Sequence, residues 1–178
     1  MIRNQKSGLK TQNSVLCVLC SMFFILFLAG CGGYTNQSLY PDDVQSIYVE
    51  MFDNATFQRD LEYDLTDAIA KRIDAETPYR IVSDKSRADT VLSGKITGIN
   101  NAALTLERSS GRALESQTEV SVQFSWKNLK TGQYLIQNST AAATASYSDF
   151  QQQDFKYGTK IAANKLAERI VEQMQKEW

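Results

Sequence analysis

Glu119-Val-Ser-Val-Gln-Phe-Ser-Trp-Lys127 alternates apolar and polar side chains along its whole length. In an extended chain, successive side chains point to opposite faces, so the apolar residues Val120, Val122, Phe124 and Trp126 share one face. The alternation predicts a β-strand with one face on a hydrophobic core and the other in water. Asn128-Leu-Lys-Thr-Gly132 is typical of a hairpin turn, and residues 133–145 are expected to return as a neighbouring strand.

Three earlier segments also have the composition of strands, because they are rich in β-branched, aromatic and other apolar residues. In the longest of them, Gly94 and Gly98 are expected to weaken the strand locally or to mark bulges. Leu104 and Leu106 are placed to extend that strand up to the turn-rich residues 108–112. The three predicted strands are Ser46–Phe52, Tyr79–Val82 and Ala88–Ile99.

Two segments show the period of an amphipathic helix, with apolar residues at spacings of three and four. The first predicts a helix of about 14 residues, which Pro78 ends. The second covers about residues 149–177 and predicts a longer helix. The apolar positions are Leu61, Leu65, Ala68, Ile69 and Ile73 in the first helix, and Ala163, Leu166, Ala167, Ile170, Val171 and Met174 in the second.

This order of elements predicts an α+β fold of two layers. Both helices are expected to cover one face of a mixed, largely antiparallel sheet of about four strands. The other face carries polar residues such as Ser121, Gln123 and Lys127, which leaves it open to solvent or to a partner.

The segment before the predicted domain looks like the leader of an exported protein. It contains Arg3, Lys6 and Lys10 but no acidic residue, and an apolar run from 15 to 28 follows. That run is shorter than the roughly 20 residues that a transmembrane helix needs. Leu28-Ala-Gly-Cys31 resembles the lipobox of bacterial lipoproteins. The alternatives are an ordinary signal peptide and a tethering helix that happens to end in cysteine.

The resemblance to lipoproteins implies cleavage before Cys31 and covalent attachment of acyl chains to this residue. We expect these acyl chains to be the only non-protein group that the protein carries. Gly32, rather than Asp, follows the cysteine, and in lipoproteins of the enterobacterial type this implies transfer to the outer membrane. The expected organisation is a signal peptide (1–30), a lipidated tether (31–45) and one folded domain (46–178).

Composition excludes several classes of function. The leader contains three of the 19 basic residues and none of the 20 acidic ones, so the remaining chain has a net charge of −4. This balance argues against general binding of nucleic acids, which requires a basic surface. The chain has no histidine, and Cys17 and Cys20 lie in the leader, so the usual hydrolase triads and zinc sites are missing. We expect neither an enzyme nor a metal site nor a bound cofactor.

The chain behind the lipobox resembles the lipopolysaccharide-assembly lipoproteins, the small partners of the outer-membrane β-barrel that inserts lipopolysaccharide. The resemblance rests on the order and spacing of several short motifs, none of which is specific alone. They are Cys31-Gly-Gly-Tyr34, Ile47-Tyr-Val-Glu-Met-Phe-Asp-Asn-Ala-Thr56, Leu61-Glu-Tyr-Asp-Leu-Thr-Asp-Ala68, Tyr79-Arg-Ile-Val-Ser83, Ala88-Asp-Thr-Val-Leu-Ser-Gly-Lys-Ile96 and Leu129-Lys-Thr-Gly132.

The resemblance implies two helices on a four-stranded sheet, in agreement with the periodicity. It also implies a non-enzymatic lipoprotein that faces the periplasm at the outer membrane. Such a protein plugs its partner barrel, helps the barrel to assemble and contacts lipopolysaccharide. The alternative function is that of a docking subunit in another export or secretion system.

Four cations are candidates for binding lipid phosphates. Arg108 and Arg112 flank a Gly/Ser turn, and Lys127 and Lys130 lie near the other end of the following strand. The alternative is that all four are ordinary solvated charges. Asn54 is expected to brace the turn after the first strand. Ser93-Gly-Lys-Ile96 does not complete a phosphate-binding loop, since isoleucine stands where Ser or Thr would bind magnesium.

Overall fold

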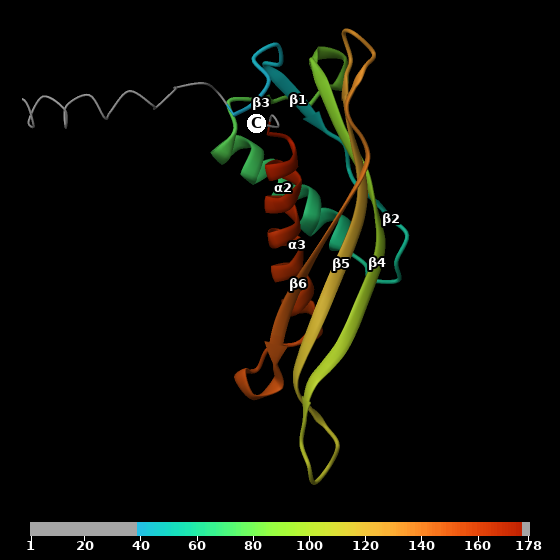
Figure 1. Ribbon diagram of the computed structural model, residues 1–178, viewed down its shortest axis with the longest axis vertical. Helices are drawn as coiled ribbons and strands as arrows, with labels where there is room; N and C mark the ends of the chain where they lie inside the picture. The colour runs from blue at the N-terminus through green and yellow to red at the C-terminus, as the bar shows by residue number, and fades with distance from the viewer. Residues whose placement is uncertain (1–38, 176–178) are drawn as a thin grey trace, which may run out of the picture. The chain divides into compact units, whose positions relative to one another are not determined.

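The computed structural model describes residues 39–175 (Figure 1). The predicted signal peptide, Cys31 and the first part of the tether lie outside the described residues. The elements follow the order β1 (Ser46–Val49), β2 (Asp53–Asn54), α2 (Leu61–Glu76), β3 (Arg80–Ile81), the 3-10 turn η2 (Lys85–Arg87), β4 (Thr90–Leu106), β5 (Ala113–Asn128), β6 (Tyr134–Ser148), the 3-10 turn η3 (Asp149–Gln151) and α3 (Phe155–Gln173).

The strands form one mixed sheet in the order β3-β1-β4-β5-β6, and β2 also pairs with β4. The long strands β4, β5 and β6 pair antiparallel with one another, whereas β1 is parallel to both β3 and β4, and β2 is parallel to β4. Both helices lie on the same side of the sheet (Figure 1). The predicted α+β class is therefore confirmed, although the sheet has six strands rather than about four. The turn expected after the first strand contains β2, which pairs with Lys95 and Ile96 beyond the end of β1.

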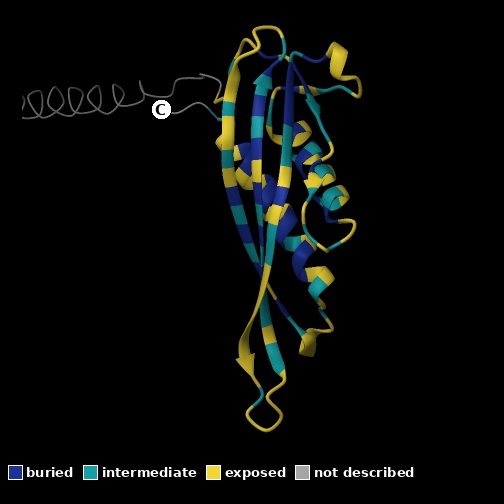
Figure 2. Cartoon of the chain, turned by 90° about the vertical axis from the view of Figure 1, so that its right-hand side faces the viewer, coloured by how far each residue is buried: buried dark blue, intermediate teal, exposed yellow. Residues whose placement is uncertain are grey.

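The alternation in β5 has the predicted structural consequence. Val120, Val122, Phe124 and Trp126 are at most 1% exposed, whereas Gln123 on the other face is exposed. Figure 2 shows buried residues alternating with partly or fully exposed ones along the long strands. One face of the sheet thus forms the floor of the core, and no helix of the described chain covers the other face (Figure 1).

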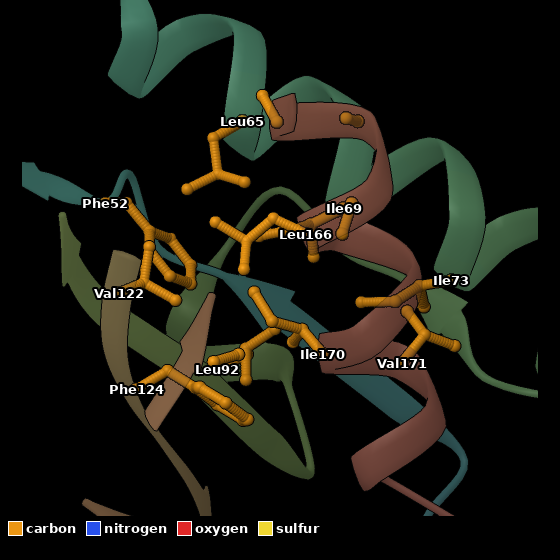
Figure 3. Close-up of a cluster of buried hydrophobic side chains, with 14 of the residues drawn as sticks. Phe52, Leu65, Ile69, Ile73, Leu92, Val122, Phe124, Leu166, Ile170 and Val171 are labelled. Carbon is orange, nitrogen blue, oxygen red and sulfur yellow. The ribbon is translucent and has the colours of Figure 1, made fainter. Parts of the chain in front are cut away.

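The core lies between this floor and the two helices. Leu65, Ile69 and Ile73 of α2 meet Leu166, Ile170 and Val171 of α3 above Phe52 and the side chains of the sheet (Figure 3). All of these residues are nearly or completely buried, as the helical spacing predicted. The core also includes Tyr40 and Val44, which lie within the stretch expected to be a tether.

Two glycines permit close packing in this core. A Cβ at Gly94 would lie 2.3 Å from Cε1 of Phe52 and 2.9 Å from the carbonyl oxygen of Gln123. Gly158 at the start of α3 lies under Tyr147, and its Cβ would approach Cδ1 of that ring to 2.5 Å. Gly94 therefore serves close packing and marks no bulge. Gly98 follows a register shift between Ile96 and Gly98, so the predicted bulge is confirmed at this second position.

The strand and helix boundaries differ from the predicted ones at the ends of the long elements. β4 reaches Leu106, as the positions of Leu104 and Leu106 predicted, but β5 begins at Ala113 rather than at Glu119, because it stays paired with β4 down to the turn. α3 begins at Phe155 rather than near Asp149, since Gln152 has a φ of 60° and the Asp154 side chain caps the helix by accepting a hydrogen bond from the Tyr157 amide at 2.7 Å. The predicted strand 79–82 is reduced to β3.

Candidate functional site

The four predicted lipid-binding cations lie at opposite ends of the sheet. Arg108 and Arg112 are in the β4–β5 turn, whereas Lys127 and Lys130 are at the β5–β6 turn. β5 alone has 16 residues, which at about 3.3 Å per residue separates the two turns by about 50 Å. Figure 1 shows the two turns at the two ends of the long strands. The four side chains therefore do not form one site.

Lys127 and Lys130 are engaged with groups of the protein itself. Nζ of Lys127 lies 5.2 Å from the centre of the Tyr134 ring, which is within the range of a cation–π contact. Nζ of Lys130 lies 2.5 Å from Oδ1 of Asp89. The turn itself is held by Asn128, whose Oδ1 accepts hydrogen bonds from the amides of Lys130 and Thr131. This pair of cations stabilises the end of the sheet.

The Asp89 side chain contacts several elements at the end of the sheet where the β5–β6 turn lies. Its Oδ2 accepts hydrogen bonds from the amides of Gln45 and Ser46, at 3.1 Å and 2.9 Å, just where β1 begins. The hydrogen bond from Lys130, together with those from Ser46 and Gln45, lowers the pKa of Asp89 to about 2, against the opposing effect of desolvation. The carboxylate thus joins β1, β4 and the β5–β6 turn.

An open depression of about 740 Å³ lies beside Asp89. Its charges are mixed, since Lys85 lies 3.1 Å from Oε1 of Glu50 and Lys130 is bound to Asp89. The cations Lys85, Arg87 and Lys130 are balanced in number by the carboxylates Asp84, Asp89 and Glu50, so the depression offers little net charge to an anion. It is lined by Asp84, Lys85, Ser86, Arg87, Ala88, Asp89, Leu129 and Lys130.

Arg108 and Arg112 are the more accessible pair. Both are exposed, and within residues 39–175 neither forms an ion pair. The turn between them is closed by a short hydrogen bond from the Ser110 hydroxyl to Glu107 and by Gly111, whose φ is 69°. The hairpin that carries them extends past the end of β6, which stops at Ser148 opposite Glu115 (Figure 2).

Asn54 has the bracing position that the sequence predicted. Its Nδ2 donates hydrogen bonds to the Gln58 carbonyl and to Oε2 of Glu62, both at 2.7 Å. Its Oδ1 accepts hydrogen bonds from the amide and the hydroxyl of Thr56. Asn54 therefore fixes the loop from β2 to α2.

The two edges of the sheet differ in a way that the sequence did not predict. At β6, Nζ of Lys165 donates a hydrogen bond to the Thr144 carbonyl at 3.2 Å, and the Arg169 guanidinium donates one to the Ala142 carbonyl. At β4, pairing with β1 and β2 ends at Ile96, and no other described strand continues along Thr97–Leu106. We call Thr97–Leu106 the open edge. Its sequence signal is ten consecutive residues without a charge or a proline.

The described residues were also compared with the requirements of a membrane-spanning helix and of a metal site. Between residues 39 and 175, no helix is long and apolar enough to cross a membrane. The same part of the chain contains no group of three or more His, Cys, Asp or Glu side chains that could hold a metal ion.

The sequence of the chain matches the model of the LptE lipopolysaccharide-assembly family over residues 44–176. The chain belongs to this family. It is accordingly a lipopolysaccharide-assembly protein, and the matched region contains every strand and helix described above. No curated protein sequence matches the chain significantly.

Solved structures share the fold of this family member at low sequence identity. An uncharacterized lipoprotein B from Nitrosomonas europaea is 12% identical with a TM-score of 0.53, and the match covers 80% of this chain and 89% of that protein. A hypothetical protein from Chlamydia trachomatis is 9% identical with the same TM-score of 0.53, over 73% of this chain and 95% of that protein. At these identities the likeness concerns the fold alone.

Proposed function

We propose that this protein is anchored to the outer membrane through acyl chains on Cys31, faces the periplasm, and plugs and helps to assemble the β-barrel that inserts lipopolysaccharide. The observation that carries the proposal is the family match over residues 44–176. The lipobox-like Leu28-Ala-Gly-Cys31 supports the anchor, since several acyl chains hold a protein at a membrane far more firmly than one.

The uncovered face of the sheet is suited to the inside of a barrel. The lumen of an outer-membrane barrel is polar, whereas its outer wall is apolar. The open face of β5 carries Ser121, Gln123 and Lys127 rather than large apolar residues. A polar face of this kind loses little free energy when it lies against a polar, hydrated wall, because water can bridge the two surfaces.

Of the two cation pairs, Arg108 and Arg112 are the better candidates for lipid phosphates. Neither has an ion-pair partner within residues 39–175, and guanidinium groups bind phosphate oxygens in a bidentate manner. Lys127 and Lys130 would first have to leave Tyr134 and Asp89. The proposal therefore assigns contact with lipopolysaccharide chiefly to the hairpin turn.

Affinity purification of the lipidated protein from its own outer membrane tests the partner. The expected result is a large β-barrel that co-purifies in equal amounts with the protein. A Cys31→Ser variant is the matched control for the anchor, and we expect it to be lost from the membrane fraction. Recovery of secretion components instead of the barrel would contradict the proposal and favour the docking subunit of another export system.

Retention of lipopolysaccharide on the purified protein tests the lipid contact. Arg108→Ser together with Arg112→Ser is expected to weaken retention, while Lys127→Ser with Lys130→Ser serves as the matched control with a smaller effect. Replacement of all four by Ser gives the limiting value. If retention is unchanged with all four replaced, these cations have no part in binding lipid.

A further inference from the structure

Residues 39–45, which the sequence predicts to be part of the lipidated tether, are held against the folded domain. Tyr40 and Val44 are 6% and 4% exposed. The Tyr40 ring packs edge-on against the Tyr79 ring, with 5.7 Å between the ring centres, and the Tyr79 hydroxyl donates a hydrogen bond to the Pro41 carbonyl at 3.3 Å. We call residues 39–45 the strap. The strap is therefore part of the domain.

The strap lies at the end of the sheet that carries the β5–β6 turn. Tyr79 directly precedes β3, and its ring lies 5.6 Å from the ring of Trp126 near the end of β5. Gln45, the last residue of the strap, donates its amide hydrogen bond to Asp89 just before β4. We call this end, with the β5–β6 turn, the strap end, and the opposite end, with the β4–β5 turn, the hairpin end (Figure 1). The chain that follows Cys31 thus enters the described domain at the strap end.

The length of chain between Cys31 and the strap limits which end of the domain can rest on the membrane. Leu39 is the eighth residue after Cys31. Whatever its conformation, a chain of this length spans at most about 29 Å. β5 alone keeps the two turns about 50 Å apart. If acyl chains on Cys31 lie in one leaflet, the hairpin end cannot rest on that leaflet while the strap end points away from it.

Exposed large apolar side chains gather mainly at the two ends of the sheet. Each end has three of them, and the other four lie on the helices or beside β2. The polar face of the sheet has none among the described residues. Of the two groups at the ends, the group at the strap end is the nearer to the anchor along the chain. The groups are Leu39, Tyr134 and Leu135 at the strap end, and Leu104, Leu106 and Phe150 at the hairpin end.

The strap end has the composition of a surface at a membrane interface. Tyr134 is 49% exposed, and Nζ of Lys127 lies over its ring. Tyrosine is enriched where membrane and water meet, and lysine extends its charge toward the head groups. The depression beside Asp89 has equal numbers of cations and carboxylates. A balanced surface of this kind suits zwitterionic head groups, which carry an ammonium group as well as a phosphate.

We propose that the strap end is a membrane-contact surface, which rests on the zwitterionic head groups of the leaflet that holds the acyl chains. The sheet then stands upright on this leaflet. Acylation of Cys31, which is part of the proposed function, is a premise of this orientation, whereas the barrel is not. Arg108 and Arg112 are held about 50 Å away from the phosphates of the anchoring leaflet, so they remain available for lipid that is presented elsewhere.

The strap keeps the anchor short. If the strap left Tyr79, the chain available as a tether would extend from Cys31 to Gln45, and its greatest length would rise from about 29 Å to about 50 Å. This length matches the distance between the two ends of the sheet. The domain could then turn over and bring the hairpin end to the leaflet. The strap therefore fixes the orientation of the domain as well as the point at which the chain enters it.

Quenching of fluorescent probes by labelled lipids tests the orientation. The lipidated full chain is purified from membranes and reconstituted in phosphatidylcholine vesicles in which some head groups carry a nitroxide. One probe is attached to Gln133→Cys in the β5–β6 turn and another to Ser109→Cys in the β4–β5 turn, both at exposed positions. We expect strong quenching at Gln133→Cys and none at Ser109→Cys. Equal quenching at both sites, or quenching at Gln133→Cys only after anionic phosphatidylglycerol is added, would overturn the proposal.

Two matched pairs of variants test the apolar contact. Tyr134→Ser with Leu135→Ser removes exposed apolar side chains at the strap end and is expected to lower the quenching at Gln133→Cys. Leu104→Ser with Leu106→Ser makes the same change at the hairpin end and is expected to leave it unchanged. All four side chains are exposed, so we expect both double variants to fold. The same loss of quenching in both would overturn the assignment of the contact to the strap end.

A longer tether tests the role of chain length. A flexible Gly/Ser segment as long as the sheet is inserted between Gln37 and Ser38, which leaves the strap unchanged. We expect quenching to appear at Ser109→Cys, because the hairpin end can then reach the leaflet. The same insertion between Thr131 and Gly132 is the control and is expected to leave Ser109→Cys unquenched. Absence of quenching at Ser109→Cys in the lengthened chain would overturn the proposal that the short anchor sets the orientation.

Flotation of the vesicles separates a failure of this orientation from a failure of the proposed anchor. The natural chain is expected to float with the vesicles, and Cys31→Ser is expected not to. A chain that floats but shows equal quenching at both probes retains its anchor and contradicts only the upright orientation. A natural chain that does not float contradicts acylation of Cys31, and the membrane contact is then overturned together with it.

Discussion

The strand β6 and the open edge of β4 are equally poor in charge, yet they differ in what covers them. Neither Tyr134–Ser148 nor Thr97–Leu106 contains a charged residue. On β6, two cations of α3 bind backbone carbonyls and thereby occupy acceptors that another strand could use. On β4, no helix or strand within residues 39–175 has this role.

The difference shows that the protection of an edge need not come from the edge strand itself. α3 crosses the sheet near β6 and presents Lys165 and Arg169 toward it, while the lower half of β4 extends beyond β1 and β2. An edge is a liability wherever its backbone groups remain accessible. The open edge is therefore the part of this fold most suited to bind another chain.

A substitution that weakens the packing of α3, the helix that covers β6, has the largest expected effect on the free energy of unfolding. Leu166 is completely buried between α3 and the sheet, and Leu166→Ala is expected to lower the free energy of unfolding by about 2–5 kcal/mol, because it leaves a cavity. Urea denaturation measures the change. Glu172→Ala, on the exposed side of the same helix, is the control, with an expected change within about 0.5 kcal/mol. Equal stability of the two variants would mean that α3 does not hold the β6 edge.

Asp89 tests the covered part of β4, where β1 is joined to it. Asp89→Asn is expected to lower the free energy of unfolding by about 1–2 kcal/mol at neutral pH, since the ion pair with Lys130 is lost. Folding lowers the pKa of this carboxyl from 3.8 to about 2. The stabilisation is thus complete above the ordinary pKa and is lost as the pH falls toward 2.

Urea denaturation at a series of pH values measures this dependence. The natural chain is expected to lose stability below pH 3.8, and the asparagine variant is expected to lose less over the same range. Asp74→Asn, on the exposed side of α2, is the matched control for removal of a carboxylate. Parallel stability curves for the natural chain and the Asp89 variant would show that Asp89 does not join the strands through its charge.

The two cations that α3 presents to β6 are exposed and can be removed without disturbing the core. Arg169→Ala with Lys165→Ala is expected to destabilise the protein by about 0.5–1.5 kcal/mol per hydrogen bond. Hydrogen exchange is expected to accelerate at the β6 amides and to remain unchanged at the open edge. Arg169→Lys with Lys165→Arg keeps both cations and serves as the control. Unchanged exchange in β6 would contradict the protective role of the two side chains.

Charges on the open edge have the smallest expected effect on the single chain. Asn100→Lys with Ala103→Lys is expected to change the free energy of unfolding of the monomer by no more than about 0.5 kcal/mol, because both positions are exposed. Thermal unfolding of the variant and of the natural chain measures it. A large loss of stability would mean that these residues contribute to the fold of the monomer.

Much of the fold could be predicted because it follows from local periodicity. The alternation at 119–127 and the three-and-four spacing in both helices identify the residues that are buried, since strand and helix geometry fix which side chains share a face. The boundaries were less accurate. Asp53–Asn54 lies where a turn is expected after the first strand but forms a strand itself, because it pairs with a segment of β4 about 40 residues later. A contact between segments so far apart cannot be predicted from the local pattern of residues.

The candidate site was only partly predictable for the same reason. The sequence identified four candidate cations, but their separation depends on how far β5 runs without interruption. It also did not show that Lys130 binds Asp89, a residue that the turn approaches only in the folded chain. The assignment of Cys31 as the site of lipidation stays a prediction, since the residue lies outside the described part of the chain.

The sequence by itself determined the class of the fold, the side of each element that faces the core and the resemblance to lipopolysaccharide-assembly lipoproteins, because these depend on residue type and on short spacings. Only the tertiary structure decided that Lys127 and Lys130 contact other groups of the protein, whereas Arg108 and Arg112 are accessible. It also decided that side chains of α3 cover β6, whereas the open edge of β4 has no covering segment among the described residues. The physical reason is that hydrogen bonds, ion pairs and strand edges join residues far apart along the chain. Whether a polar group or a backbone edge is satisfied depends on what folding brings beside it.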